Sequence, residues 1–135
     1  MKKETFAMIS EMEFVEPASE ELIEAVENEM NIVFPEQYLR FMKLTNGAEG
    51  PLGSNSYLSI WPLDEIPSLN DEYGVRKFTP SLVYFGSDGG GTAYAFDFRA
   101  VPPVIVEFPF DSIDIDDAVK IADTIDGFIA ALYQR

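Results

Sequence analysis

The sequence predicts an α+β fold in which helices and an antiparallel sheet occupy different parts of a single domain, residues 1–135. Three observations support this prediction. Apolar side chains recur at helical spacing in the first third of the chain. The middle contains short alternating or β-branched segments bounded by glycine and proline, and the end of the chain again fits a helix. We expect about four to six strands, with the N-terminal helices and a C-terminal helix packed around them.

The first residues predict a short helix followed by extended chain. Residues 3–12 place Phe6, Ile9 and Met12 at helical spacing, so we expect these side chains to face inward. Residues 14–17 end in a proline and predict an extended segment that leads to the next helix.

Residues 21–30 predict an amphipathic helix, with Ser19 as its N-cap and glutamates near its positive end. Its inward stripe contains Leu22, Ile23, Val26 and Met30. Pro35 disfavours helical geometry at Phe34 and suits the first position of a second helix over residues 36–45. The inward stripe of that second helix contains Tyr38, Phe41 or Met42, and Leu44. Asn46 and Gly47 are able to adopt the left-handed conformation that ends a helix.

The middle of the chain predicts strands joined by turns. Residues 48–56 are rich in glycine, proline and asparagine and predict a loop. Residues 57–61 alternate as a strand that Pro62 ends, and residues 67–77 contain a short helical turn. Three further strands are expected at residues 82–85, 92–97 and 103–108.

Residues 86–91, Gly-Ser-Asp-Gly-Gly-Gly, join two of these strands. Glycine-rich loops cradle phosphate when their N–H groups converge at a helix N-terminus, but this segment has no Gly-Lys-Ser/Thr ending and precedes strand-like residues. We therefore expect a hairpin with positive-φ glycines, in which Asp88 binds turn N–H groups, and Asp97 at the end of the following strand.

Residues 118–132 allow two interpretations. A single helix would bury one stripe from Ala118 to Leu132. Alternatively, Val119 and Ile121 alternate as a strand, and Thr124 caps a helix that starts at Ile125. The residues alone leave both open.

Composition excludes several classes of protein. There is no histidine and no cysteine, so zinc sites and Ser–His or Cys–His nucleophiles are excluded, and we expect neither catalysis nor a cofactor. The net charge of −15 and the scattered basic residues disfavour direct nucleic-acid binding. No apolar run approaches the roughly 18–20 residues of a membrane span, and no secretory segment follows the basic start. We expect a cytoplasmic protein.

Five segments, taken in order, carry a resemblance to a known family. They are residues 32–38 with Phe41 and Asn46-Gly47 after them, 58–66 with its Trp-Pro turn, 83–91, 94–97 and 122–129. Together they resemble the SUKH superfamily, whose founding Smi–Knr group is named after fungal regulators of cell-wall synthesis. The resemblance covers roughly residues 15–134. It departs from the family pattern at Thr124, where serine is commoner, and at Gly127, where a larger residue is commoner.

The resemblance implies the strand-then-helix interpretation of residues 118–132. It also implies a function, because many members of this superfamily are bacterial immunity proteins that bind and neutralise toxins, often nucleases or other nucleic-acid-modifying enzymes. Fungal members act as interaction hubs in signalling. We therefore expect a non-catalytic binding protein, with a basic cognate toxin as its partner. An intracellular regulatory module not linked to a toxin is the alternative, and a small-molecule enzyme ranks third. The sequence leaves the oligomeric state open.

Residues 110–117 are the candidate contact segment. They crowd four carboxylates, Asp111, Asp114, Asp116 and Asp117, into seven positions. A calcium loop counted from Asp111 would need glycine at its sixth position and glutamate at its twelfth, which hold Asp116 and Ala122, so no metal is expected. We expect an exposed acidic surface that contacts a basic partner. Two residues elsewhere are treated as structural: Trp61 as a core aromatic, and Glu27, which needs a partner such as Arg40 or a backbone donor if it turns inward.

Overall fold

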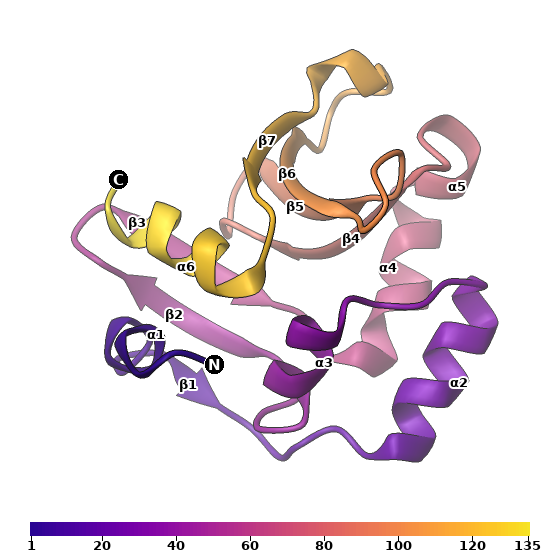
Figure 1. The fold of residues 1–135 in the computed structure, drawn as a ribbon. Coiled ribbons are helices and arrows are strands. Elements are labelled where there is room, and N and C mark those ends of the chain that lie inside the picture. Colours follow the sequence, from indigo (N-terminus) through magenta and orange to yellow (C-terminus); the bar gives the residue numbers. More distant parts are fainter.

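The computed structural model describes residues 1–135 and contains one curled antiparallel sheet surrounded by helices (Figure 1). Seven strands follow one another across the sheet in chain order, each antiparallel to its neighbours. They are β1 (Glu13–Phe14), β2 (Ala48–Leu52), β3 (Ser56–Ile60), β4 (Leu82–Ser87), β5 (Thr92–Asp97), β6 (Val104–Pro109) and β7 (Val119–Ala122). The α+β class is confirmed, whereas the expected four to six strands are too few.

The extra strands lie where the sequence predicts a loop and extended chain. Residues 48–56 were expected to be irregular, but β2 alternates between buried and exposed positions and pairs with β3 along its whole length. The prediction is wrong here because Gly50 and Pro51 hide the alternation. Gly50 has a φ of 154° and lies against the backbone of Met12, where a side chain would collide. Contact with a distant segment therefore selects glycine at this strand position.

The helices cover both faces of the sheet (Figure 1). They are α1 (Lys3–Met8), α2 (Glu20–Met30), α3 (Glu36–Met42), α4 (Ile66–Glu72), α5 (Val75–Phe78) and α6 (Ile125–Tyr133), with two short 3-10 turns, η1 (Leu63–Glu65) and η2 (Ile115–Asp117). The longest, α2, has 11 residues, far short of the roughly 20 that a helix needs to cross a bilayer.

Local sequence signals place several helix ends correctly. The Ser19 hydroxyl caps α2 by accepting a hydrogen bond from the Leu22 N–H at 3.1 Å. Thr124 caps α6 in the same way through the Gly127 N–H, also at 3.1 Å. Because β7 precedes that cap, the strand-then-helix interpretation of residues 118–132 is confirmed.

Two predicted helices are too long. The first ends at Met8 rather than residue 12, and Phe6 is 46% exposed instead of facing inward. The third ends at Met42 rather than residue 45, leaving Leu44 52% exposed. The Thr45 hydroxyl accepts the Val15 N–H at 2.9 Å and donates to the Gly47 carbonyl at 2.6 Å. The first of these bonds is tertiary and the second is local, and together they turn the chain into β2 before the helix can continue.

The β4–β5 hairpin matches its prediction in outline. The Asp88 carboxylate accepts hydrogen bonds from the N–H groups of Gly90 at 2.8 Å and Thr92 at 3.1 Å. Gly86 belongs to β4, so the turn is shorter than the expected 86–91. Within the turn, Gly89 alone has a positive φ, 81°, so only one of the expected left-handed glycines is present. Asp97 ends β5, as expected.

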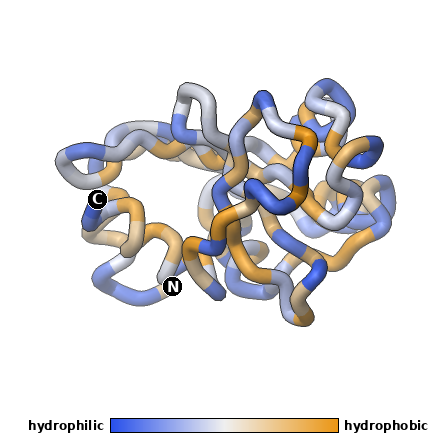
Figure 2. Tube along the Cα trace, turned by 90° about the horizontal axis from the view of Figure 1, so that it is seen from above, coloured by the Kyte–Doolittle hydropathy of each residue, from blue (hydrophilic) through white to orange (hydrophobic).

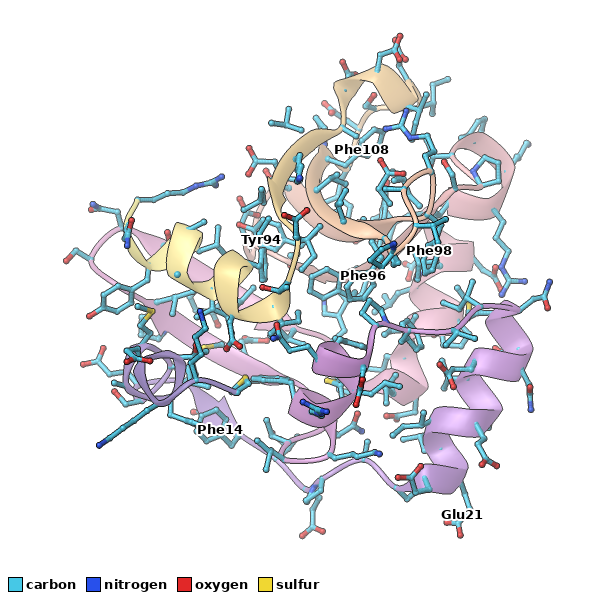
Figure 3. All side chains as sticks on the ribbon, in the orientation of Figure 1. Phe14, Glu21, Tyr94, Phe96, Phe98 and Phe108 are labelled. Carbon is cyan, nitrogen blue, oxygen red and sulfur yellow. The ribbon has the colours of Figure 1, made fainter.

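The core is one cluster of 33 buried residues, and its aromatic rings form two groups on opposite faces of the sheet (Figure 3). On the face covered by α3 and α6, Tyr94 and Phe96 meet rings from both helices; Phe96 lies 5.0 Å from Tyr38 and Tyr94 lies 4.9 Å from Phe128 between ring centroids. On the other face, inside the curl of the sheet, Tyr84 and Phe108 lie 6.3 Å apart. Along the trace, many outer turns are hydrophilic and the strands between them are hydrophobic (Figure 2).

Replacing Tyr38 by phenylalanine is expected to stabilise the protein. The Tyr38 side chain is completely buried, and its hydroxyl has no hydrogen-bond partner. Removing the hydroxyl relieves an unsatisfied desolvation cost, so the free energy of unfolding should rise by about 1 kcal/mol in urea titrations. Tyr94→Phe is the control, because that hydroxyl is not sealed from solvent, and it should change stability little. A loss of stability in Tyr38→Phe would show that the hydroxyl has a partner.

Candidate functional site

The acidic segment forms the connection between β6 and β7 and includes η2 (Figure 1). Three of its apolar side chains, those of Phe110, Ile115 and Ala118, pack against the core, whereas Ile113 is exposed. The carboxylate-bearing residues of the segment face outward, and all four expected positions are exposed: Asp111, Asp114, Asp116 and Asp117. The structure thus brings the four predicted contact residues together on one exposed connection.

Local hydrogen bonds hold this segment in shape. The Asp114 carboxylate caps η2 by accepting the Asp116 N–H at 2.9 Å. The Ser112 hydroxyl donates to the Asp117 carboxylate at 2.6 Å and accepts the Asp114 N–H at 3.0 Å. The side chains of Asp111 and Asp116 make no hydrogen bond within the chain. No lysine or arginine forms an ion pair with any of the four carboxylates, so their charges are free to meet an external cation.

Arg99, near this segment, forms an ion pair with a different carboxylate, that of Asp97. Its guanidinium forms a forked contact with Asp97, which is 4% exposed, at 2.7 Å to one oxygen and 3.0 Å to the other. Hydrogen bonds from Arg99 lower the pKa of Asp97 below its usual 3.8. The hydrogen bond to Asp97 and, to a smaller extent, the negative charge of Asp116 raise the pKa of Arg99. Arg99 therefore lies within the field of the acidic segment without neutralising it.

A stack of three aromatic rings adjoins the acidic segment. Tyr73, at the end of α4, lies 4.5 Å from Phe110 and 6.5 Å from Trp61 between ring centroids. Trp61 is buried, as expected for a core aromatic, whereas Tyr73 is 43% exposed. Nothing in the sequence connects Tyr73 with Phe110, since the 36 intervening residues include three strands. The signal available in the sequence was Phe110, an aromatic residue directly before Asp111.

A second acidic surface, shaped as a hollow, lies at the other edge of the sheet and was not predicted from the sequence. It has a volume of about 310 Å³ and is lined by Glu13, Glu49 and Glu65, among other residues. Glu13 and Glu49 lie directly opposite one another on β1 and β2, an arrangement of like charges that destabilises a strand pair. The Tyr57 hydroxyl donates to Glu49 at 2.6 Å, and this hydrogen bond raises the pKa of Tyr57.

Glu27 and its candidate partner Arg40 each form a contact within the fold, but not with one another. Glu27 accepts the Phe34 N–H at 2.8 Å and so fixes the connection between α2 and α3. Its partner is the backbone donor, because Arg40 pairs instead with Glu36 at 2.6 Å. No group of three or more carboxylates is arranged to hold a metal ion.

The comparison with known proteins gives one match. Residues 17–131, which include the acidic segment and the aromatic stack, match the model of the SMI1 / KNR4 family (SUKH-1). No curated protein matches the sequence significantly.

Proposed function

The chain belongs to the SMI1 / KNR4 family (SUKH-1), and from this membership we propose that it is an immunity protein that binds and neutralises a toxin. A non-catalytic role in immunity or regulation fits this family. The acidic segment is the observation that supports a toxin as the partner. It holds four exposed carboxylates in place, and none of them forms an ion pair with a cation of the chain.

The chemistry of the partner follows from charge. A toxin that attacks nucleic acid binds phosphates through lysine and arginine and is therefore basic. A net charge of −15 attracts such a protein and accelerates the encounter. We propose that Asp111, Asp114, Asp116 and Asp117 contact the basic surface that would otherwise bind phosphate. The protein would act in the cytoplasm, where the nucleic acid is, and would not itself bind nucleic acid.

The second candidate is a regulatory interaction module with no toxin partner. The acidic hollow around Glu13 and Glu49 favours considering it, because a second acidic surface, in which like charges face one another, suits a protein with more than one partner. Co-expression separates the candidates. An immunity protein must restore growth to cells that produce the toxin encoded beside its gene, whereas a regulatory module must not.

Charge reversal tests the acidic segment within this proposal. Asp111→Lys combined with Asp116→Lys changes two side chains that make no hydrogen bond within the chain, so the fold should remain intact by circular dichroism. We expect the association rate with the toxin to fall about tenfold or more at low salt and to depend less on NaCl, because these carboxylates steer a cationic partner.

The matched control is Glu13→Lys combined with Glu65→Lys, which makes the same change in net charge at the second hollow. It should slow association less than the variant of the acidic segment. Equal effects of the two variants would show that only net charge matters and would reject the acidic segment as the contact. Failure of the wild-type protein to restore growth would reject that toxin as its partner.

A further inference from the structure

We infer that the exposed ring of Tyr73 is a binding position for an arginine side chain of the basic partner. This inference rests on the proposed function for the partner's charge, and it adds a specific residue and a specific chemistry. The acidic segment accounts for attraction at a distance, whereas an aromatic anchor accounts for affinity once the proteins touch.

Three aromatic rings contact Tyr73, yet much of its side chain remains exposed. Phe110 lies 4.5 Å away at an interplanar angle of 30°, and Trp61 lies 6.5 Å away and almost parallel, at 12°. Tyr84 closes the cluster from the sheet at 6.1 Å. Tyr73 nevertheless keeps 43% of its surface exposed. The side chain is thus supported from within and open to solvent, the arrangement that makes aromatic residues strong interface anchors.

The position of Tyr73 is fixed by the helix that carries it. The buried side chain of Asn70, one turn earlier in α4, donates to the Tyr84 carbonyl at 3.0 Å and accepts the Tyr84 N–H at 2.9 Å. These bonds hold α4 against β4. A partner that binds Tyr73 therefore loses little conformational entropy in ordering it.

Charge selects a cation as the occupant. Phe110, in contact with Tyr73, leads directly into Asp111 and the acidic segment. The cations closest in sequence face elsewhere: Arg76 donates to the Glu29 carbonyl at 3.3 Å, and the Lys77 ammonium lies 5.2 Å from the Phe78 ring. An arginine suits this position better than a lysine, because its planar guanidinium stacks on an aromatic ring while its N–H groups reach nearby carboxylates.

Two peptides of equal charge test this inference without a toxin. Acetyl-(Gly-Arg)₄-amide and acetyl-(Gly-Lys)₄-amide are titrated into the protein at physiological salt, and emission from Trp61, the chain's single tryptophan, reports binding next to Tyr73. We expect the arginine peptide to bind about threefold more tightly, because a planar guanidinium stacks on the ring as well as attracting it, whereas an ammonium does not stack. The preference should persist in Tyr73→Phe and disappear in Tyr73→Leu.

Tyr133→Leu is the matched control, because Tyr133 is 42% exposed but lies on α6. It should keep the arginine preference. Equal binding of both peptides to the wild-type protein would overturn the inference, as would a preference that survives Tyr73→Leu. If Tyr73→Leu does not fold, NMR of the wild-type protein titrated with the arginine peptide decides. Saturable changes in the backbone amide chemical shifts of Tyr73 and Gly74 support the inference, and their absence overturns it.

The outcome is separate from that of the immunity proposal. An arginine preference without restored growth would reject the toxin and leave this binding position standing. Restored growth without an arginine preference would reject only the role of Tyr73.

Discussion

Replacing Asn70 by leucine is expected to lower the free energy of unfolding by about 4 kcal/mol, although Asn70 is polar and has no part in the proposed surface. Asn70 is completely buried and makes three hydrogen bonds, to the Ile66 carbonyl, the Tyr84 carbonyl and the Tyr84 N–H. Leucine has a similar volume but makes none of them. It would leave the strand N–H and C=O buried without partners, at a cost of about 1–3 kcal/mol for each group.

The need for Asn70 arises from the end of the neighbouring strand. The β3–β4 ladder ends where the Trp61 N–H donates to the Phe85 carbonyl at 2.9 Å, and Pro62 follows, which has no N–H to donate. Tyr84 lies next to an irregularity in the β4–β5 register. The side-chain amide of Asn70 presents an N–H donor and its carbonyl oxygen side by side to Tyr84 and so takes the place that a continuing strand would occupy.

Urea titration of Asn70→Leu measures the effect, with Asn28→Leu on the exposed side of α2 as control. The control should change stability by less than about 0.5 kcal/mol. A loss below about 1 kcal/mol in Asn70→Leu would show that Tyr84 finds other partners. A loss of the predicted size would indicate that α4 is no longer held against β4, and Tyr73 at the end of α4 would then be displaced as well.

Elements defined by neighbouring residues could be predicted from the sequence. Ser19 caps α2 because the orphan N–H group lies three residues away, and Asp88 binds the turn that contains it. The end of the chain was ambiguous from periodicity alone, because Val119 and Ile121 fit a helix and a strand equally well. Family resemblance decided between them correctly, since it adds the order of elements in related chains.

Elements defined by distant contacts could not be predicted. In β2, Gly50 and Pro51 are signals of a loop, and only the approach of Met12 explains the glycine. The candidate contact residues likewise fall into those predictable from the sequence and those that were not. The acidic segment was visible because its four carboxylates are close in sequence, whereas Tyr73 and the pair Glu13 and Glu49 are brought to their sites by the sheet.

Replacing Arg99 by leucine is expected to lower the free energy of unfolding at pH 7 by about 2 kcal/mol. The change leaves the buried Asp97 carboxylate without its guanidinium partner, and hydrogen bonds to charged groups contribute about 1.5–3 kcal/mol each. The 49% exposure of Arg99 limits the loss through solvent screening. Arg40→Leu is the control, because Arg40 pairs with Glu36 in open solvent and its loss should cost less than about 0.5 kcal/mol.

The pH dependence of this loss distinguishes charge from packing. Arg99 lowers the pKa of Asp97 below 3.8, so in the unfolded chain that carboxyl binds its proton at higher pH than in the folded protein. The stabilisation is therefore present above about pH 4 and disappears as the pH falls through the lowered pKa. The difference between wild type and Arg99→Leu should shrink correspondingly in urea titrations below pH 4. A difference that stays constant down to pH 2 would mean that the arginine stem stabilises the fold by packing, and that Asp97 does not depend on the ion pair.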